Sequence, residues 1–173
     1  MNILLYELGA YGPVILIVIT WYLLWENKNL FFYYTVGVFT NAVINLILKG
    51  IIQQPRPIFD SKTIRLATMH KKEQFYSSGI PFDVFGMPSG HAQSSFFSTV
   101  FIYLSTKHIN TFYLYLASSL LTCYQRYDSN YHSILQLIVG SIIGAAFGYF
   151  VYQLAREKIK GKIREKPDDD API

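Results

Sequence analysis

The chain alternates between long apolar runs and polar connections. Each run approaches 20 residues, the length that an α-helix needs to cross a hydrocarbon core about 30 Å thick. Five such runs follow one another, at residues 8–25, 30–49, 91–106, 109–124 and 133–155. The pattern therefore predicts an all-α fold, a polytopic membrane helix bundle of about five transmembrane helices.

One connection is much longer than the others. Residues 53–87 are polar and rich in Pro, Gly, Lys and Ser, and we expect a short interfacial helix around 61–70. The third and fourth apolar runs are short for isolated spans, so we expect them to depend on packing against their neighbours. Residues 161–173 form a polar tail that we expect to be disordered, which leaves residues 1–160 as one membrane-embedded domain.

Composition agrees with a membrane location. Hydrophobic residues make up 51% of the 173 residues and charged residues only 15%, less charge than a soluble surface normally carries. The net charge is +4, but the basic residues are scattered or gathered at the ends of the apolar runs. That distribution argues against nucleic acid as a partner. We expect the bilayer and a membrane lipid as partners, with the oligomeric state unassigned.

The number of spans predicts which connections lie on the same side. With five spans, the 49–88 and 125–132 connections fall on one side of the membrane. The opposite side carries eight of the 15 Lys and Arg residues, and this side carries seven, including Lys49, Arg56 and Arg126. These three belong to a candidate site and do not count toward orientation. Because Lys and Arg concentrate in cytoplasmic loops, we expect the site to face the lumen or the exterior.

The first of three polar stretches with phosphate-binding chemistry follows the second apolar run. Lys49 ends that run, and Arg56 follows seven residues later between two prolines. The prolines exclude helix and stiffen the backbone, and a firmly held guanidinium suits bidentate binding of a phosphate. We predict that Lys49 and Arg56 bind phosphate. Asn41 and Asn45 share a helical face with Lys49, and we expect them to join helices by hydrogen bonds.

The second stretch, Pro88-Ser89-Gly90-His91, begins the third apolar run. Helix capping alone explains Ser89. The backbone N–H groups at a helix N-terminus also bind anions, and glycine lets a phosphate approach the backbone closely. We therefore predict that Ser89 and Gly90 bind phosphate and that His91 performs acid–base chemistry.

The third stretch carries Arg126, His132 six residues later, and Gln136 one helical turn beyond. A single histidine at a membrane edge is usually structural. Here Arg126 and His91 converge on the same side, so we favour catalysis for His132 and phosphate binding for Arg126. The face of Gln136 continues in small residues that predict close helix packing: Gly140, Gly144 and Gly148.

We expect no metal and no other cofactor. The two site histidines, together with Asp83 or Asp128, imitate a ligand set, but no compact ligand spacing supports a metal site.

The three stretches resemble the motifs of the type 2 phosphatidic acid phosphatase superfamily: K-x6-RP, PSGH and SR-x5-H-x3-D. The first two are intact here, whereas the third has Gln125 in place of Ser and Gln136 in place of Asp. The resemblance implies that His132 attacks phosphorus and forms a phosphohistidine, while His91 protonates the leaving oxygen. The three cations and the Ser89–Gly90 backbone would hold the phosphoryl oxygens.

Gln136 bears on the substrate. An Asp at this position would fix the tautomer of His132 and stabilise its developing positive charge. A Gln can orient the ring but supplies no charge, so we expect slower chemistry. The dolichyl diphosphatase branch resembles this chain in having Gln there and in a GMPSxHxQ stretch like residues 86–93. A diphosphate ester also has a far better leaving group than an alkoxide, so we favour a polyprenyl or dolichyl diphosphate over phosphatidic acid.

Two alternatives stay open. One is a phosphatidic acid or other lipid phosphate phosphatase, or a phosphotransferase that uses a lipid alcohol instead of water. The other is a catalytically weakened binding or scaffold protein in the membrane, motivated by Gln125 and Gln136.

Overall fold

A computed structural model describes residues 3–58, 76–77 and 80–159. Within these residues the chain forms five α-helices and one small hairpin, which confirms the predicted all-α architecture. The helices are α1 (Ile3–Leu24), α2 (Lys28–Ile52), α4 (Gly90–Thr106), α5 (Ile109–Asp128) and α6 (Ile134–Ile159). The hairpin pairs β1 (Tyr76–Ser77) with β2 (Ile80–Pro81) in antiparallel register and was not predicted. The predicted helix at 61–70 and the tail at 161–173 lie outside the described residues.

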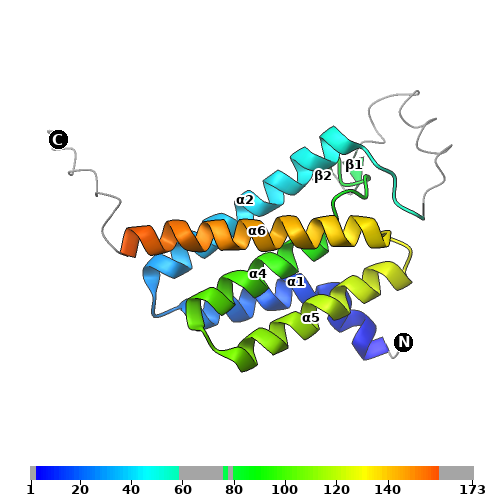
Figure 1. Cartoon of the computed structure of the whole chain (residues 1–173). Coiled ribbons are helices and arrows are strands. Elements are labelled where there is room, and N and C mark those ends of the chain that lie inside the picture. Colours follow the sequence, from blue (N-terminus) through cyan, green and yellow to red (C-terminus); the bar gives the residue numbers. More distant parts are fainter. Residues whose placement is uncertain (1–2, 59–75, 78–79, 160–173) are drawn as a thin grey trace, which may run out of the picture.

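Successive helices run in opposite directions along the bundle (Figure 1). As a result, the end of α2, the start of α4, the end of α5 and the start of α6 lie together at one end. This is the end at which the three polar stretches occur, as the number of apolar runs predicted. The opposite end holds the α1–α2 and α4–α5 turns.

Both ends of α2 are set by its sequence. Asn27 caps the start of the helix by accepting a hydrogen bond from the Leu30 N–H at 3.1 Å. Gln53 ends it in the left-handed conformation, with a φ of 50° and its N–H donated to the Lys49 carbonyl. The prolines that follow cannot continue a helix. Arg56 therefore lies on an extended segment immediately beyond the helix end.

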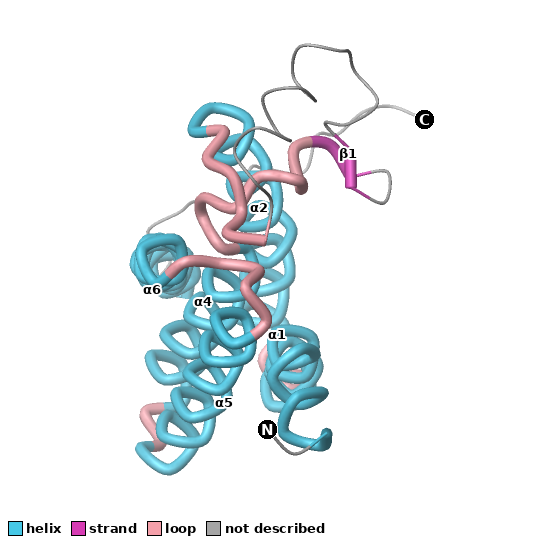
Figure 2. Tube along the Cα trace, turned by 90° about the vertical axis from the view of Figure 1, so that its right-hand side faces the viewer, coloured by secondary structure: helices cyan, strands magenta, loops and turns pink. Residues whose placement is uncertain are grey.

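The short helix α4 lies at the centre of the bundle and contacts each of the other four helices (Figure 2). The glycine stripe of α6 packs directly on its backbone. A Cβ added at Gly144 would lie 2.0 Å from the Gln93 carbonyl oxygen, and one at Gly148 would lie 2.6 Å from that of Phe97. The predicted close packing is confirmed, and it explains how a helix of only 17 residues is held.

The apolar core fills the end of the bundle away from the polar stretches. It is formed by buried aromatic and aliphatic side chains of α1, α2, α4 and α6, together with Tyr115 of α5. Tyr34 contacts Phe97 and Phe101 with ring centroids 5.6 and 5.2 Å apart. The hydroxyl of Tyr34 shares a hydrogen bond with Ser98 at 2.7 Å, so the buried polar atom is satisfied.

Three of the described helices are long and apolar enough to cross a membrane: α1, α2 and α6. Many of their apolar side chains are exposed, including Val14, Phe39 and Ile142, an arrangement that suits lipid and not water. The chain is a multi-pass membrane protein. The predicted boundaries are close to the observed ones, but α1 begins at Ile3 and not at residue 8, and α5 continues past residue 124 to Asp128.

Candidate active site

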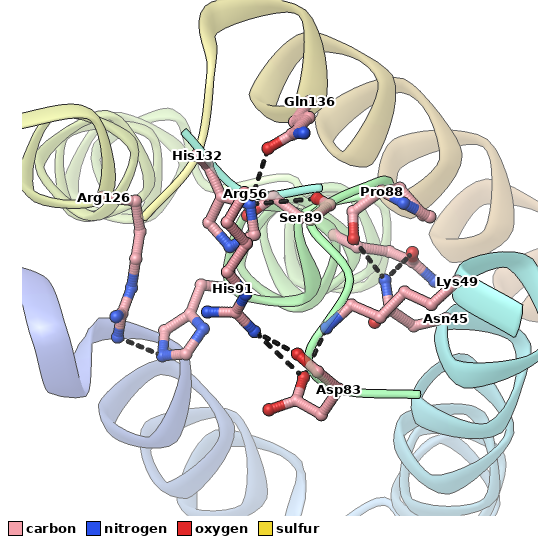
Figure 3. Close-up of polar contacts among 12 residues, drawn as sticks. Asn45, Lys49, Arg56, Asp83, Pro88, Ser89, His91, Arg126, His132 and Gln136 are labelled. Atoms are coloured by element: carbon pink, nitrogen blue, oxygen red, sulfur yellow. Dashed lines mark hydrogen bonds and ion pairs between the residues drawn. The ribbon is translucent and has the colours of Figure 1, made fainter. Parts of the chain in front are cut away.

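The side chains predicted to form the site come together at the polar end of the bundle. Figure 3 shows Arg56, His91 and His132 around one space, with Arg126 at one edge and Lys49 at the other. Lys49 belongs to α2, His91 to the first turn of α4, and Arg126 to the last turn of α5. His132 lies in the short connection between α5 and α6. Residues 83 positions apart in the sequence therefore contribute to one site.

Lys49 and Arg56 share a partner, Asp83, that the sequence analysis considered only as a possible metal ligand and not as a partner of these cations. The Lys49 ammonium forms an ion pair with Oδ1 of Asp83, and Nη2 of Arg56 lies 3.3 Å from the same oxygen. Nη2 of Arg56 also donates to the Asp83 backbone carbonyl. Asp83 stands in the polar connection before α4, where one carboxylate among many polar residues gives no sequence signal.

The guanidinium groups are incompletely satisfied. The Nε atoms of Arg56 and Arg126 are buried, and neither has a hydrogen-bond acceptor among the described residues. A buried donor without an acceptor is costly, and such groups are rare away from functional sites. Two buried guanidinium N–H groups in one site are the donor set that a phosphate accepts best.

Ser89 and Gly90 shape the start of α4. Ser89 is the N-cap, and its hydroxyl lies 3.5 Å from the Ala92 N–H. Its own N–H donates to the Gln136 carbonyl at 3.1 Å, so this amide is already used within the fold. A Cβ at Gly90 would lie 3.0 Å from Asn45 Oδ1, so the close approach of α2 to α4 requires a small residue here. Gly90 is the first residue of α4 and is followed by His91, so its backbone lies at the helix N-terminus as the sequence predicted.

A buried amide network holds the second stretch against α2. Asn45 donates to the Pro88 carbonyl at 3.2 Å and to Gln93 Oε1 at 2.8 Å. Gln93 in turn donates to the side chain and the carbonyl of Asn41, at 2.9 and 3.0 Å. The expectation that the two asparagines join helices is confirmed. Gln93, absent from the predicted site, positions the loop before His91.

His132 has a defined tautomer. Its Nδ1 lies 3.0 Å from the Gly86 carbonyl oxygen and 3.3 Å from Gln136 Oε1. Both neighbours are acceptors, so Nδ1 must carry the proton. Nε2 then holds the free electron pair, on the side of the ring opposite these two contacts. A histidine so oriented is prepared to act as a nucleophile.

The orientation of Gln136 is fixed by chemistry as well. Its Nε2 donates to the Pro55 carbonyl at 2.8 Å and to Gln54 Oε1 at 3.1 Å. Because a backbone carbonyl only accepts, the amide nitrogen must point to the 53–57 segment and Oε1 to His132. Gln136 thus connects the segment that carries Arg56 with the ring of His132. Sequence reasoning missed Gln54, because no motif marks it.

Gly86 completes this arrangement. A Cβ added there would lie 2.6 Å from Gln136 Oε1, so any larger residue displaces the amide. The Gly86 N–H also donates to the Gln54 carbonyl at 2.8 Å. The three polar stretches are therefore joined to one another by neutral hydrogen bonds around His132.

Burial lowers the pKa of His132, which lies outside the helices, to about 3, and the charges of Arg56 and Lys49 act in the same direction. The imidazole is therefore neutral at physiological pH, as a nucleophile must be. A bound phosphate adds negative charge beside the ring and opposes this effect.

His91 and Arg126 contact each other directly, through Nε2 and Nη2. The same Nη2 lies 3.5 Å from the Ala10 carbonyl of α1, and the guanidinium lies 5.3 Å from the Tyr131 ring centroid. Gln125, the departure next to Arg126, donates to Ser129 at 3.2 Å and packs against Gly9. It supports the α1–α5 contact and does not reach the histidines.

A cavity of about 350 Å³ opens beside His91. Its polar wall includes Asn45, Asp83 and Gly90, and its remaining wall is formed mainly by apolar residues of α1 and α2 such as Val14 and Leu46. The site therefore adjoins an apolar space between two helices.

The described residues contain no group of three or more His, Cys, Asp or Glu side chains placed to hold a metal ion. The prediction that the reaction uses no metal remains to be tested by experiment.

The model of the PAP2 superfamily matches residues 30–160 of the chain. This chain belongs to that superfamily. Among PAP2 relatives, dolichyldiphosphatase of Saccharomyces cerevisiae (strain ATCC 204508 / S288c) is 32% identical over 139 residues, which cover 70% of this chain and 51% of the yeast protein. Lipid phosphate phosphatase epsilon 2, chloroplastic, of Arabidopsis thaliana is 28% identical over 125 residues.

The Arabidopsis alignment covers 68% of this PAP2 chain and 37% of the relative. The chain thus spans about half the length of the first relative and less of the second. No solved structure matches the chain.

Proposed function

We propose that this PAP2 protein is a membrane lipid phosphatase that forms a phosphohistidine at His132. The observation that carries the proposal is the pair of carbonyl oxygens on Nδ1 of His132, at 3.0 and 3.3 Å. They keep the proton on Nδ1 and the electron pair on Nε2, beside three cations that suit a phosphate. The His132 ring is thus oriented by two neutral acceptors and not by a carboxylate.

In the first step, Nε2 of His132 forms a bond to phosphorus while the bond from phosphorus to the leaving oxygen breaks. Protonated His91 gives its proton to that oxygen. Arg126 now donates to His91, and a phosphate offers this guanidinium a stronger, charged acceptor. Substrate binding would therefore free His91 for proton transfer.

In the second step, water attacks the phosphohistidine and gives a proton to His91, and the N–P bond breaks to release inorganic phosphate. Covalent catalysis divides one difficult displacement into two easier ones. Lys49, Arg56 and Arg126 stabilise the charge on the phosphoryl oxygens, together with the helix N-terminus at Gly90. These cations take the place that metal ions hold in many phosphoryl-transfer sites, so the reaction needs no metal.

A polyprenyl or dolichyl diphosphate is the substrate that we favour. The uncharged Gln136 gives the His132 ring no negative neighbour. A lipid diphosphate loses a lipid monophosphate in the first step, and this leaving group demands less of the nucleophile than an alkoxide does. The similarity to the yeast dolichyldiphosphatase supports this choice. The apolar walls of the cavity beside His91 suit the hydrocarbon part of a lipid.

All five helices cross the membrane in this proposal, as one domain over residues 1–160. The central position of α4 and its contacts with every other helix allow it to span despite its length. The excess of Lys and Arg at the opposite end supports a luminal or extracytoplasmic location for the site.

Phosphate release in detergent, with EDTA present, tests this function. The substrates are a polyprenyl diphosphate, the matching monophosphate and phosphatidic acid. We expect release without added metal, fastest from the diphosphate. Faster release from phosphatidic acid would reassign the substrate, and transfer to an added lipid alcohol would reassign the acceptor. Absence of release from all three would favour a binding or scaffold role.

A further inference from the structure

The carboxylate of Asp83 lies where a phosphate bound to Lys49 and Arg56 would have to lie. Its Oδ1 contacts the Lys49 ammonium and lies 3.3 Å from Nη2 of Arg56. These are the two ion pairs formed by the described residues. Asp83 and His91 also line the same cavity, so the carboxylate borders the proposed reacting space.

The three partners differ in their freedom to move. The side chains of Lys49 and Arg56 are 3% and 15% exposed, whereas that of Asp83 is 34% exposed. Removing either cation from its place would bury an unpaired charge, which is expensive. The carboxylate can instead turn toward water at little cost. Asp83 is the partner that can leave.

A carboxylate and a phosphate accept from the same donors in the same geometry. They also repel each other, because two negative charges a few ångströms apart at the edge of a protein interact unfavourably. A phosphate that reaches Lys49 and Arg56 must therefore displace Asp83 or bind weakly beside it. Competition from the Asp83 carboxylate also favours departure of inorganic phosphate after the second step.

We propose that Asp83 is an intramolecular competitor that sets the affinity of the site for phosphate. It holds the two cations in place while the site is empty and gives way to the headgroup. This inference rests on the proposed assignment of Lys49 and Arg56 to phosphate binding. Asp83 thereby determines how strongly the enzyme retains both its substrate and its product.

Inorganic phosphate is the probe, with two readouts. The first is the rise in Tm of the purified full chain with phosphate concentration, which gives an affinity without catalysis. The second is inhibition of lipid hydrolysis by phosphate, with KM and kcat measured separately. The variants are Asp83→Asn, which keeps the shape and removes the charge, and Asp83→Glu, which keeps the charge.

Asp128→Asn is the matched control. Asp128 is an exposed carboxylate at the end of α5, on the same end of the bundle, so its removal changes the net charge equally. We expect Asp83→Asn to bind phosphate on the order of tenfold more tightly than the wild type and to have a lower KM. Asp128→Asn and Asp83→Glu should both stay near the wild type in phosphate affinity and KM. Retained kcat in Asp83→Asn would support competition.

The opposite result overturns the inference. If Asp83→Asn binds phosphate equally or more weakly, or raises KM while kcat falls, the carboxylate serves to position the cations. If Asp83→Asn does not fold, Asp83→Glu decides by the same Tm titration. Because the retained charge should compete as Asp83 does, an unchanged phosphate affinity with kcat retained would support competition, and a weaker phosphate affinity or a lost kcat would contradict it. If the proposed hydrolysis is wrong, the result is a different one: the wild type binds inorganic phosphate but releases no phosphate from any lipid substrate.

Discussion

The two ends of the helix bundle bury polar groups in opposite ways. At the end with the aromatic core, buried hydroxyls pair with one another: Tyr34 with Ser98 at 2.7 Å and Thr20 with Tyr115 at 2.9 Å. At the other end, Lys49, Arg56 and Arg126 crowd around two histidines. Within the described part of the chain, Asp83 is the carboxylate that pairs with Lys49 and Arg56.

This difference shows which end stabilises and which end functions. Packed aromatic rings and paired hydroxyls contribute stability without unmet bonds. Buried cations with too few acceptors cost stability, and the Nε atoms of Arg56 and Arg126 still lack acceptors among the residues described. The unused donors of the polar end suit an anion, as the proposed function requires.

Replacing a histidine at each end gives the largest contrast. We expect His132→Ala to lower phosphate release by about 10³-fold or more, because no other group can replace the nucleophile. His108→Ala, at the exposed start of α5 on the opposite end, should keep wild-type activity. The measurement is the initial rate of phosphate release in detergent. More than a few per cent of activity left in His132→Ala would remove His132 from this role.

The second largest effect concerns the proton donor. We expect His91→Ala to lower the rate by about 10²-fold or more on lipid monophosphates. The loss should be smaller on diphosphates, because a good leaving group needs less protonation. Comparing kcat/KM on a matched pair of lipids measures the difference. An equal loss on both would argue that His91 is not a general acid.

A smaller effect should follow from exchanging the uncharged residue beside His132. We expect Gln136→Asp to lower kcat about tenfold on diphosphates and by less on monophosphates, where the added negative charge beside His132 partly offsets the lost hydrogen bonds. A carboxylate cannot donate to the Pro55 carbonyl or to Gln54 as the amide does, at 2.8 and 3.1 Å. A gain in activity on both substrates would mean that negative charge matters more than these two hydrogen bonds.

The smallest effect on activity should come from the aromatic end. We expect Phe97→Ala to lower the free energy of unfolding by about 3 kcal/mol, because it leaves a cavity beside Tyr34 and Phe101. The rate per folded molecule should stay within about twofold of the wild type. Thermal unfolding in detergent and activity corrected for folded protein provide the two values. A large loss of kcat at unchanged stability would contradict the division between the ends.

The architecture was predictable because long apolar runs leave the backbone few choices in lipid. The number of runs also placed the three polar stretches at one end. Boundaries were less accurate: α1 begins at Ile3, before the acidic Glu7 that interrupts the apolar pattern.

Parts of the site could not be predicted, because they depend on backbone atoms and on the path of loops. The acceptors of His132 Nδ1 are a backbone carbonyl of Gly86 and an amide oxygen of Gln136, and the sequence pattern does not show where a backbone carbonyl points. Gln54 and Asp83 belong to connections whose course no periodicity defines. Ser89 matched the capping pattern, but the use of its N–H by Gln136 appears only in the folded chain.

Identification of the phosphorylated residue tests the central claim most directly. The wild type is mixed with a lipid diphosphate, stopped with alkali within one turnover, digested, and mapped by mass spectrometry under conditions that preserve phosphohistidine. Covalent catalysis through Nε2 predicts phosphate on His132, and none in the His132→Ala variant. Phosphate on another residue, or phosphate release by an active wild type with no phosphoenzyme under any quench, would contradict the account.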